Sequence, residues 1–289
     1  MGHISSEYDQ PVTSGKWAAN GIESEEQPEI DTSVAHSARI YDYILGGKNN
    51  FEADRRAAEA AVARNPKMAV AMRANRAVMR RMTAYLAAET DVRQFLDIGT
   101  GLPTSPNVHE IAQQFAPESR VVYVDNDPIV LAHARALLTS NSKGACAYIA
   151  ADAREPEKIL ADPRLNSTLD LSRPVALMLF GIMHFLTDGD DPRAVVACLL
   201  DALPSGSYLA IQHPTADFYP PGTGAQGAYR SAGIPFQYRS REEFARFLDG
   251  LEVVEPGITP MSEWRPEIEP GPHPEPSEAG AYAALARKP

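Results

Sequence analysis

Acidic side chains and glycines recur at spacings that suit the binding of a nucleoside. The segment Asp97-Ile98-Gly99-Thr100-Gly101 follows one short apolar run, and Asp125-Asn126-Asp127 ends a second one. Glycines let the backbone turn sharply after a strand and approach a ligand closely, which a Cβ would obstruct. The carboxylate of Asp125 can accept hydrogen bonds from two vicinal ribose hydroxyls. The pattern therefore predicts a nucleoside site at the ends of two neighbouring strands.

The acid before the first glycine distinguishes between classes of cofactor. In dinucleotide-binding enzymes the pyrophosphate lies on a helix N-terminus behind G-x-G-x-x-G, where a carboxylate would repel it. Here Asp97 precedes Gly99 by two residues, and Thr104 stands in place of the third glycine. An acid at this position suits the ammonium and sulfonium cations of S-adenosylmethionine. An NAD-dependent dehydrogenase is disfavoured.

These motifs resemble those of the class I S-adenosylmethionine-dependent methyltransferases. Asp97 to Gly101 is similar to their D-x-G-x-G turn, Asp125 to their ribose-binding acid and Asp152 to the acid near adenine N6. Pro103 departs from the pattern, because the family often has a third glycine there. The resemblance implies S-adenosyl-L-methionine as cofactor, S-adenosyl-L-homocysteine as product, and these cofactor-binding residues: Asp97, Gly99, Thr100, Gly101, Leu102, Asp125, Asn126, Asp152, Ala153 and Phe180.

A closer resemblance lies upstream. Residues 37–51 (SARIYDYILGGKNNF), together with Gly101-Leu102-Pro103-Thr104 and Val108-His109-Glu110, are similar to an actinobacterial methyltransferase-like family of the DUF574 type. This resemblance covers nearly everything from about residue 31 onward, and it implies no particular substrate.

The glycine pair Gly46-Gly47 cannot favour a helix interior. A flexible turn flanked by Tyr41, Tyr43, Lys48 and Asn49 is expected to close over the cofactor as a lid and to contact the substrate. The alternative is a helix that ends at Gly46, with both tyrosines packed on the core.

His184 and Tyr41 are the candidate catalytic residues. His184 follows the fourth expected strand, at the sheet edge where ligands gather in α/β folds, although a packing or positioning role is favoured over catalysis there. His109 and His213 are expected to pack rather than to act as bases. The expected reaction is in-line attack of a substrate O, N, S or carbanion on the sulfonium methyl. Positioning supplies much of the acceleration there, and a dedicated base is not required.

Short apolar strands that alternate with helices must position these residues. Expected strands lie at 94–98, 120–124, 145–150, 175–180, 208–212, 251–254 and 281–286, and expected helices include 52–64 and 68–89. A capping box at Ser240 to Glu243 marks a further helix start. Residues 218–238 form an expected insertion after the fifth strand, where substrate pockets are often built, and 265–278 an expected loop. The family resemblance implies a seven-stranded Rossmann-like sheet of order 3-2-1-4-5-7-6, with the last strand antiparallel.

The expected organisation is α/β with three parts. These are a disordered tail at 1–30, a helical N-terminal cap or lid at 31–90, and a Rossmann-like S-adenosylmethionine-binding methyltransferase domain at 91–289.

Composition limits the partners. A formal net charge of −11 argues against nucleic acid, and the basic run of Arg73, Arg76, Arg80 and Arg81 is expected on a solvated or ion-paired surface. No apolar run approaches the ~18 residues of a membrane span, and no zinc-ligand spacing occurs among the two cysteines. We expect a cytoplasmic, metal-free enzyme with a small-molecule acceptor. A regulatory module that binds S-adenosylmethionine or S-adenosylhomocysteine without turnover is the alternative, and the acceptor and oligomeric state stay open.

Overall fold

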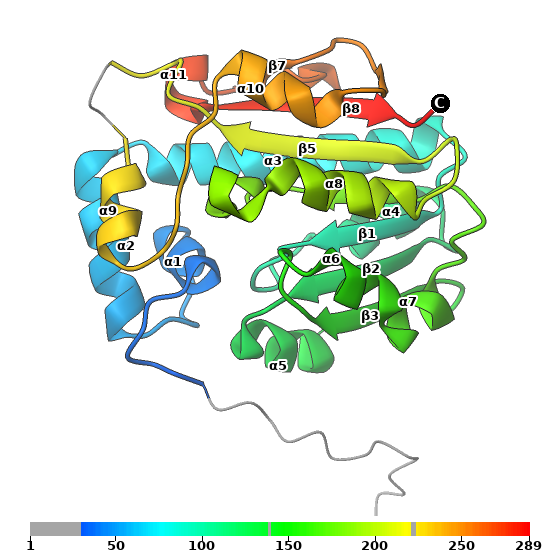
Figure 1. Ribbon diagram of the computed structural model, residues 1–289, viewed down its shortest axis with the longest axis horizontal. Coiled ribbons are helices and arrows are strands. Elements are labelled where there is room, and N and C mark those ends of the chain that lie inside the picture. The colour runs from blue at the N-terminus through cyan, green and yellow to red at the C-terminus, as the bar shows by residue number, and fades with distance from the viewer. Residues whose placement is uncertain (1–29, 138–139, 221–223) are drawn as a thin grey trace, which may run out of the picture.

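A mixed β-sheet with helices on both faces organises the chain (Figure 1). The computed structural model describes residues 30–137, 140–220 and 224–289, so the tail expected at 1–30 lies outside the described residues except for Ile30. The strand order is β3-β2-β1-β4-β5-β8-β6, and β7 pairs with β8 beside this path. The strands are β1 (Gln94–Ile98), β2 (Arg120–Asp125), β3 (Ala145–Ala150), β4 (Ala176–Leu179), β5 (Tyr208–Pro214), β6 (Glu252–Val253), β7 (Thr259–Pro260) and β8 (Ala281–Arg287).

The expected strand order is confirmed, with β8 as the last strand of the expected seven. Strands β1 to β5 pair in parallel, and β8 runs antiparallel to β5. The additional strand β7 was not expected, because its two residues are too few for a periodic pattern and one of them is Pro260. Its register is set by pairing with Tyr282 and Ala283 of β8 rather than by its own sequence.

Helices of very different length cover the sheet and its edges. The two expected helices, 52–64 and 68–89, are confirmed as α2 and α3. None of the helices in the described ranges combines the length and apolar character that a membrane crossing requires. The α-helices are α1 (Ser37–Ile44), α2 (Glu52–Arg64), α3 (Met68–Glu89), α4 (Val108–Phe115), α5 (Pro128–Leu137), α6 (Pro156–Ala161), α7 (Pro163–Thr168), α8 (Pro192–Asp201), α9 (Gln226–Ser231), α10 (Arg241–Ala245) and α11 (Pro276–Ala279), and the 3-10 turns are η1 (Met183–Phe185), η2 (Asp188–Asp190), η3 (Arg246–Leu248) and η4 (Pro266–Ile268).

Both faces of the sheet are buried, as continuous apolar runs in parallel strands require. In Figure 1, α6, α7 and α8 lie in front of the sheet, and α3 and α4 lie behind it. Val78, Met82 and Leu86 of α3 share one apolar cluster with Phe95 and Val121 of the sheet. Helix α3 is therefore part of the sheet's own core as well as of the N-terminal helical region.

The carboxyl ends of the parallel strands face a second group of helices. Figure 1 shows α1, α2 and α9 beyond these strand ends, at the left of the view. They are held together by an apolar cluster that includes Ile40, Met72, Tyr229 and Phe236. The space between this cluster and the strand ends is where the cofactor motifs lie.

Two capping arrangements set the ends of the helices near this space. The buried carboxylate of Asp54 accepts hydrogen bonds from the backbone N–H of His36 and of Phe51, both at 2.8 Å, and so fixes the starts of α1 and α2 together. The expected capping box at α10 is confirmed. Ser240 N–H donates to Glu243 Oε2 at 2.8 Å, and Glu243 N–H donates to Ser240 Oγ at 3.2 Å.

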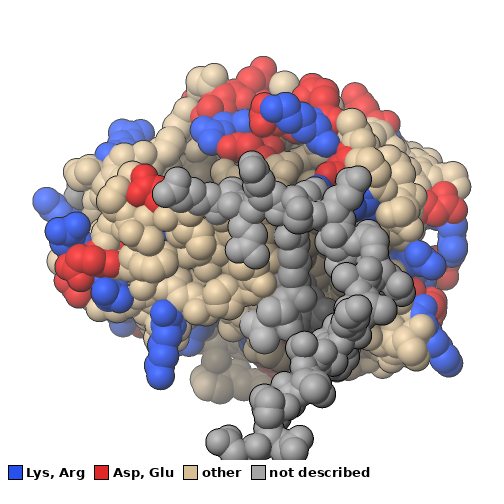
Figure 2. All heavy atoms as spheres, turned by 90° about the horizontal axis from the view of Figure 1, so that it is seen from below, with Lys and Arg blue, Asp and Glu red and all other residues tan. Residues whose placement is uncertain are grey.

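Charged side chains are mixed on the surface. On the described residues visible in Figure 2, basic and acidic side chains lie next to each other around a broad uncharged area, rather than as one basic surface. The expectation of a surface position was wrong for Arg81, which is only 1% exposed and donates to the backbone oxygens of Trp264 and Met261, both at 2.7 Å. It is nevertheless ion-paired, since its Nη1 lies 4.0 Å from Glu269 Oε2. Its neighbour Arg80 pairs with Glu269.

Candidate functional site

One cavity of about 670 Å³ lies between the carboxyl ends of the parallel strands and the helices α1, α3 and α9. A volume of this size is typical of small-molecule and cofactor sites. All ten residues predicted to bind the cofactor line it: Asp97, Gly99, Thr100, Gly101, Leu102, Asp125, Asn126, Asp152, Ala153 and Phe180.

Asp97 ends the apolar part of β1 as a buried carboxyl. Its Oδ2 accepts a hydrogen bond from Thr100 Oγ1 at 3.1 Å. Burial raises the pKa of Asp97 to about 7, and the Thr100 hydrogen bond and the charge of Arg76 offset this only in part. The site thus holds a carboxyl that a neighbouring cation would ionise.

Asp125 ends β2 beside the glycine turn. Gly101 N–H donates to Asp125 Oδ2 at 2.8 Å, and Asp127 N–H donates to Oδ1 at 3.0 Å. These two bonds fix the carboxylate plane, and each oxygen keeps a lone pair for a ligand. Burial raises the pKa of Asp125 above its ordinary value. The side chain is therefore preorganised to accept hydrogen bonds from hydroxyl groups.

The turn after β1 is held against β2 by its backbone. Gly99 N–H and Thr100 N–H both donate to the carbonyl oxygen of Val124, at 2.8 and 3.2 Å. Gly99 has a φ of +73°, and a Cβ there would lie 2.6 Å from the side chain of Ile182. Gly101 has a φ of +67° and open space where a Cβ would be. The first glycine thus allows close packing, and the second leaves room in the cavity.

Asp152 lies at the end of β3 within a small polar network. Asn126 Nδ2 donates to Asp152 Oδ2 at 3.1 Å, and Arg154 donates to both carboxylate oxygens, at 2.9 and 2.5 Å. The Arg154 hydrogen bond is the main reason that the pKa of Asp152 is lowered. This part of the lining is more exposed than Asp97 and Asp125, which are 7% and 6% exposed.

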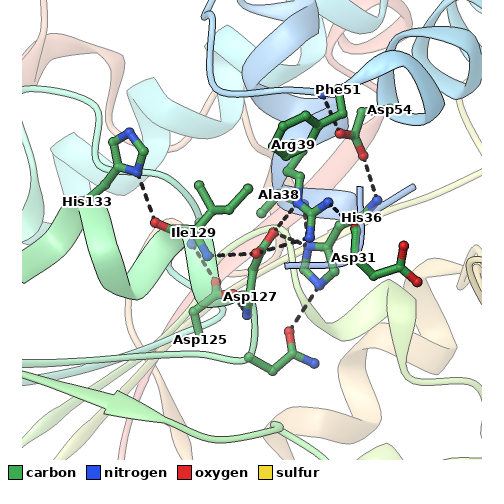
Figure 3. Close-up of polar contacts among 12 residues, drawn as sticks. Asp31, His36, Ala38, Arg39, Phe51, Asp54, Asp125, Asp127, Ile129 and His133 are labelled. Carbon is green, nitrogen blue, oxygen red and sulfur yellow. Dashed lines mark hydrogen bonds and ion pairs between the residues drawn. The ribbon is translucent and has the colours of Figure 1, made fainter. Parts of the chain in front are cut away.

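An ion pair that the sequence did not indicate joins α1 to the end of β2 (Figure 3). Arg39 Nε donates to Asp127 Oδ2 at 2.8 Å, and Nη2 donates to Oδ1 at 3.3 Å. His36 Nδ1 lies 3.1 Å from the same Oδ2, and His36 Nε2 lies 3.2 Å from Asn126 Oδ1. Burial lowers the pKa of His36, but the hydrogen bond and charge of Asp127 outweigh it and raise the pKa above 6.5. Helix α1 is thus fastened directly beside Asp125.

The residues predicted for a lid are divided by the structure. Tyr41, Gly46 and Gly47 line the cavity, and Tyr41 Oη donates to the carbonyl oxygen of Met72 at 2.8 Å. Gly46 N–H and Gly47 N–H donate to the carbonyls of Tyr43 and Asp42, at 2.9 and 2.8 Å, which closes the C-terminus of α1 as a Schellman motif.

The other three predicted lid residues are not among the described residues that line the cavity. Tyr43 Oη donates to Glu59 Oε1 of α2 at 3.0 Å, and Lys48 and Asn49 are exposed. Helix α1 ends at Ile44 with Leu45 as its C-cap, so the alternative of a helix that ends near Gly46 is observed two residues earlier than predicted. Movement of this segment as a lid stays a prediction.

The three histidines considered as possible general bases differ in their surroundings. His184 lines the cavity, and its buried Nδ1 has no hydrogen-bond partner within the described residues. His213 is engaged, since its Nδ1 lies 2.8 Å from the Pro214 carbonyl oxygen and its Nε2 lies 2.9 Å from Arg239 Nη1. Burial lowers the pKa of His213 to about 3. His109 Nδ1 lies 2.8 Å from Tyr123 Oη in the core, as packing predicts.

The far part of the cavity is lined by aromatic side chains that the sequence analysis did not predict individually. We call the set Phe185, Tyr219, Tyr229, Phe236 and Tyr238 the aromatic wall. Four of the five come from the insertion at 218–238, for which a pocket-building role was expected. Its density of aromatic residues was the signal that could have identified them. Asn75 of α3 and Gln212 of β5 also belong to the polar part of the lining and were not predicted.

Comparisons with known proteins agree along nearly the whole chain. A model of the family described as S-adenosyl methyltransferase matches residues 23–289. The solved structure of a DUF574 family protein from Streptomyces avermitilis is 50% identical, with a TM-score of 0.85, and the match covers 90% of this chain and 100% of that one. A structure from Thermobifida fusca, provisionally described as a methyltransferase, is 40% identical, with a TM-score of 0.82 and coverage of 92% and 99%. The search of curated proteins finds no match.

Proposed function

Because this chain belongs to the S-adenosyl methyltransferase family, it is an S-adenosylmethionine-dependent methyltransferase, and we propose that it methylates a small molecule held in the cavity at the strand ends. One observation carries this proposal. The ten cofactor residues and the aromatic wall line the same cavity of about 670 Å³, so cofactor and acceptor can meet inside it.

The carboxyl groups of the lining fit the cationic and hydroxyl groups of S-adenosylmethionine. Burial raises the pKa of Asp97 to about 7. A cation bound beside it favours the ionised carboxylate and is attracted to it. The ammonium and sulfonium groups of the cofactor are such cations. Asp125, held by Gly101 N–H and Asp127 N–H, is oriented to accept hydrogen bonds from ribose hydroxyls. Asn126, Asp152 and Ala153 would then lie on the adenine side.

When bound, S-adenosylmethionine supplies a methyl group that is already activated by the positive charge on sulfur. The work left to the protein is to orient the acceptor and to exclude water. We assign the orienting role to His184 and Tyr41, which both line the cavity. Burial lowers the pKa of His184 well below 6.5, and the charges of His213 and Arg239 add to this. The neutral ring would accept a hydrogen bond from the acceptor rather than serve as a strong base.

A small acceptor suits the site better than a macromolecule. In the aromatic wall, Tyr229 and Phe236 are buried, at 4% and 5% exposure, and the other three side chains are half-buried. The net charge of −11 disfavours nucleic acid as acceptor. Two free cysteines, Cys146 and Cys198, fit the reducing environment of the cytoplasm. We propose that location for the enzyme.

Calorimetric titration with S-adenosylmethionine, S-adenosylhomocysteine and, as control, NAD tests the cofactor site. The two adenosyl ligands should bind and NAD should not. Asp125→Ala should weaken adenosyl binding at least about tenfold, because hydrogen bonds to a charged group are lost. Unchanged affinity in a folded Asp125→Ala protein would refute the assignment of Asp125. Tight cofactor binding without methyl transfer to any component of broad small-molecule pools would instead favour a regulatory module.

A further inference from the structure

Two buried polar atoms in the cavity have no hydrogen-bond partner within the described residues. They are Asn75 Oδ1 of α3 and His184 Nδ1 of η1. Both side chains line the cavity, and they are only 9% and 8% exposed. Asn75 lies beside the end of β4, because its Nδ2 is 3.2 Å from where a Cβ on Gly181 would be. His184 follows the same strand by a few residues, so both atoms belong to one region of the site.

Of the two polar atoms of the Asn75 side chain, Nδ2 has a hydrogen-bond partner and Oδ1 has none within the described residues. Asn75 Nδ2 donates to Tyr41 Oη at 3.5 Å, and Tyr41 Oη in turn donates to the carbonyl oxygen of Met72 at 2.8 Å. The remaining Oδ1 can only accept a hydrogen bond. Buried polar atoms are rarely left unsatisfied in native proteins, because the cost of their desolvation is then not recovered. A ligand with a hydrogen-bond donor would satisfy this oxygen.

His184 supplies the second polar position in an otherwise aromatic setting. Its ring centroid lies 4.0 Å from that of Phe185 and 4.7 Å from that of Phe236. Burial holds the pKa of His184 well below 6.5, so the ring is neutral at pH 7 and offers one accepting nitrogen and one N–H. Asn75 and His184 therefore each offer a hydrogen-bond acceptor in the same region of the cavity.

The aromatic wall continues from His184 as a connected set of rings. Neighbouring centroids lie 5.8 Å apart for Phe185 and Tyr229, 5.1 Å for Tyr229 and Phe236, 5.0 Å for Phe236 and Tyr238, and 6.5 Å for Tyr238 and Tyr219. Aromatic rings at such separations also suit the edge and offset contacts that a further ring can make. The wall favours a planar apolar ligand.

The charged groups near this part of the cavity are already engaged. Among the described lining residues of α1 and α3, the charged side chains are Asp42 and Arg76. Asp42 Oδ2 accepts from Asn49 N–H and Asn50 Nδ2, each at 2.9 Å, and Arg76 donates to the carbonyls of Thr104 and Pro106. Their charges are of opposite sign, so this part of the lining carries no net charge to offset an ionised acceptor, and burying such an acceptor unpaired is costly.

We propose that the acceptor is a neutral aromatic small molecule that carries a hydroxyl or amino group. Its ring packs on the aromatic wall. An amino group donates to both Asn75 Oδ1 and the accepting nitrogen of His184, whereas a hydroxyl donates its one hydrogen to either of them. This proposal rests on the proposed function, since it assumes that the adjoining residues hold the cofactor. Asn75 and His184 are then the specificity-determining residues.

Binding of three matched probes to the protein saturated with S-adenosylhomocysteine tests the proposal. The probes are 2-naphthol, which has a donor, 2-methoxynaphthalene, which has none, and 2-naphthoate, which is anionic. Calorimetry should show 2-naphthol binding about three- to tenfold tighter than 2-methoxynaphthalene, as expected for one net hydrogen bond, and no binding of 2-naphthoate. Tightest binding of 2-naphthoate, equal binding of the two neutral probes, or no binding of any probe would overturn the proposal.

Two apolar substitutions assign the recognition to the named atoms. Asn75→Leu and His184→Phe should each reduce the preference for 2-naphthol over 2-methoxynaphthalene, while the exposed Asn166→Leu on α7 should leave it unchanged. A purely structural role would weaken both neutral probes equally, and that result would contradict the assignment. Titration with S-adenosylhomocysteine in the same variants separates the two proposals. If S-adenosylhomocysteine does not bind to the native protein, the proposed cofactor site is refuted. If it binds to the variants while their preference for 2-naphthol is lost, the assignment of Asn75 and His184 to the acceptor is supported.

Discussion

Arg39 and Asp127 form a buried, two-bonded ion pair between α1 and the end of β2 (Figure 3). The Asp127 side chain is fully buried, and that of Arg39 is 4% exposed. Asp127 is two residues from Asp125, whose carboxylate it also holds through its own N–H at 3.0 Å. The same residue thus anchors the first helix and orients the proposed ribose-binding acid.

Removal of one member of this pair should destabilise the fold strongly. We expect Arg39→Ala to lower the free energy of unfolding by about 3 kcal/mol, because it leaves the Asp127 carboxylate buried with fewer partners. Arg193→Ala is a suitable control. Arg193 Nη2 lies 3.0 Å from Asp249 Oδ2 in an exposed pair, for which a loss of at most about 0.5 kcal/mol is expected. Urea denaturation measures both, and equal losses would contradict the importance of the buried pair.

Asp127 should also contribute to the acid sensitivity of the protein. The hydrogen bonds from His36 and Arg39 outweigh burial and lower the pKa of Asp127 from 3.8 to about 2. A carboxyl with a lowered pKa in the folded state stabilises it above pH 3.8, and this stability is lost as the pH falls toward 2. The shift corresponds to about 2 kcal/mol. The difference in unfolding free energy between the native protein and Asp127→Asn should therefore shrink between pH 5 and pH 2.5, and a constant difference would refute this origin.

The lining of the proposed cofactor side of the cavity was predictable because its determinants are local. Asp97, Gly99 and Gly101 are fixed relative to a strand end by a few bonds. Asp125 ends β2, and Asp152 lies two residues after β3. In a parallel sheet these ends meet at one edge, so short motifs suffice to bring them together. This is why all ten predicted residues line the cavity.

The contacts of α1 were less predictable because they join residues that are distant in the sequence. Arg39 and Asp127 are separated by 88 positions, and no local spacing relates them. Within α1, Tyr41 and Tyr43 differ by two positions, which places them about 200° apart around a helix. Only one of the two can face the cavity, and the position of α2 decides that it is Tyr41, since Tyr43 contacts Glu59. The strand β7 was missed for the same reason, as pairing with β8 creates it.

Asp97 should couple cofactor binding to proton release. Burial raises its pKa to about 7, so part of the population carries a proton near neutral pH. A cationic ligand favours the ionised form, and its affinity should therefore rise as the pH increases from 5.5 to 8. Titration with S-adenosylmethionine at pH 6.5, in buffers of different ionisation enthalpy, should show proton release. Asp97→Asn should bind more weakly and release none at this site, and identical proton release in both proteins would contradict the role of Asp97.

Gly99 and Gly101 should respond differently to the same substitution, although both have a positive φ. The left-handed conformation costs an alanine about 1 kcal/mol at either position. At Gly99 the new Cβ would also lie 2.6 Å from Ile182 Cβ and Cγ1, whereas at Gly101 no heavy atom lies within 4 Å. Overpacking of this kind costs about 1 to 3 kcal/mol more. Gly99→Ala should therefore lower the free energy of unfolding by about 3 kcal/mol, and Gly101→Ala by about 1 kcal/mol.

The two variants should also differ in how they affect cofactor binding. Gly101→Ala, the more stable of the two, should show the direct loss of affinity. The methyl group at Gly101 enters the cavity next to the N–H that holds Asp125, so Gly101→Ala should stay folded and yet lose affinity for S-adenosylmethionine. The clash at Gly99 is with one side chain, and adding Ile182→Ala should restore part of the stability lost in Gly99→Ala. Urea denaturation with calorimetry distinguishes these effects. If Ile182→Ala does not raise the free energy of unfolding of Gly99→Ala, then backbone strain, rather than packing against the segment after β4, explains the requirement for glycine at that position.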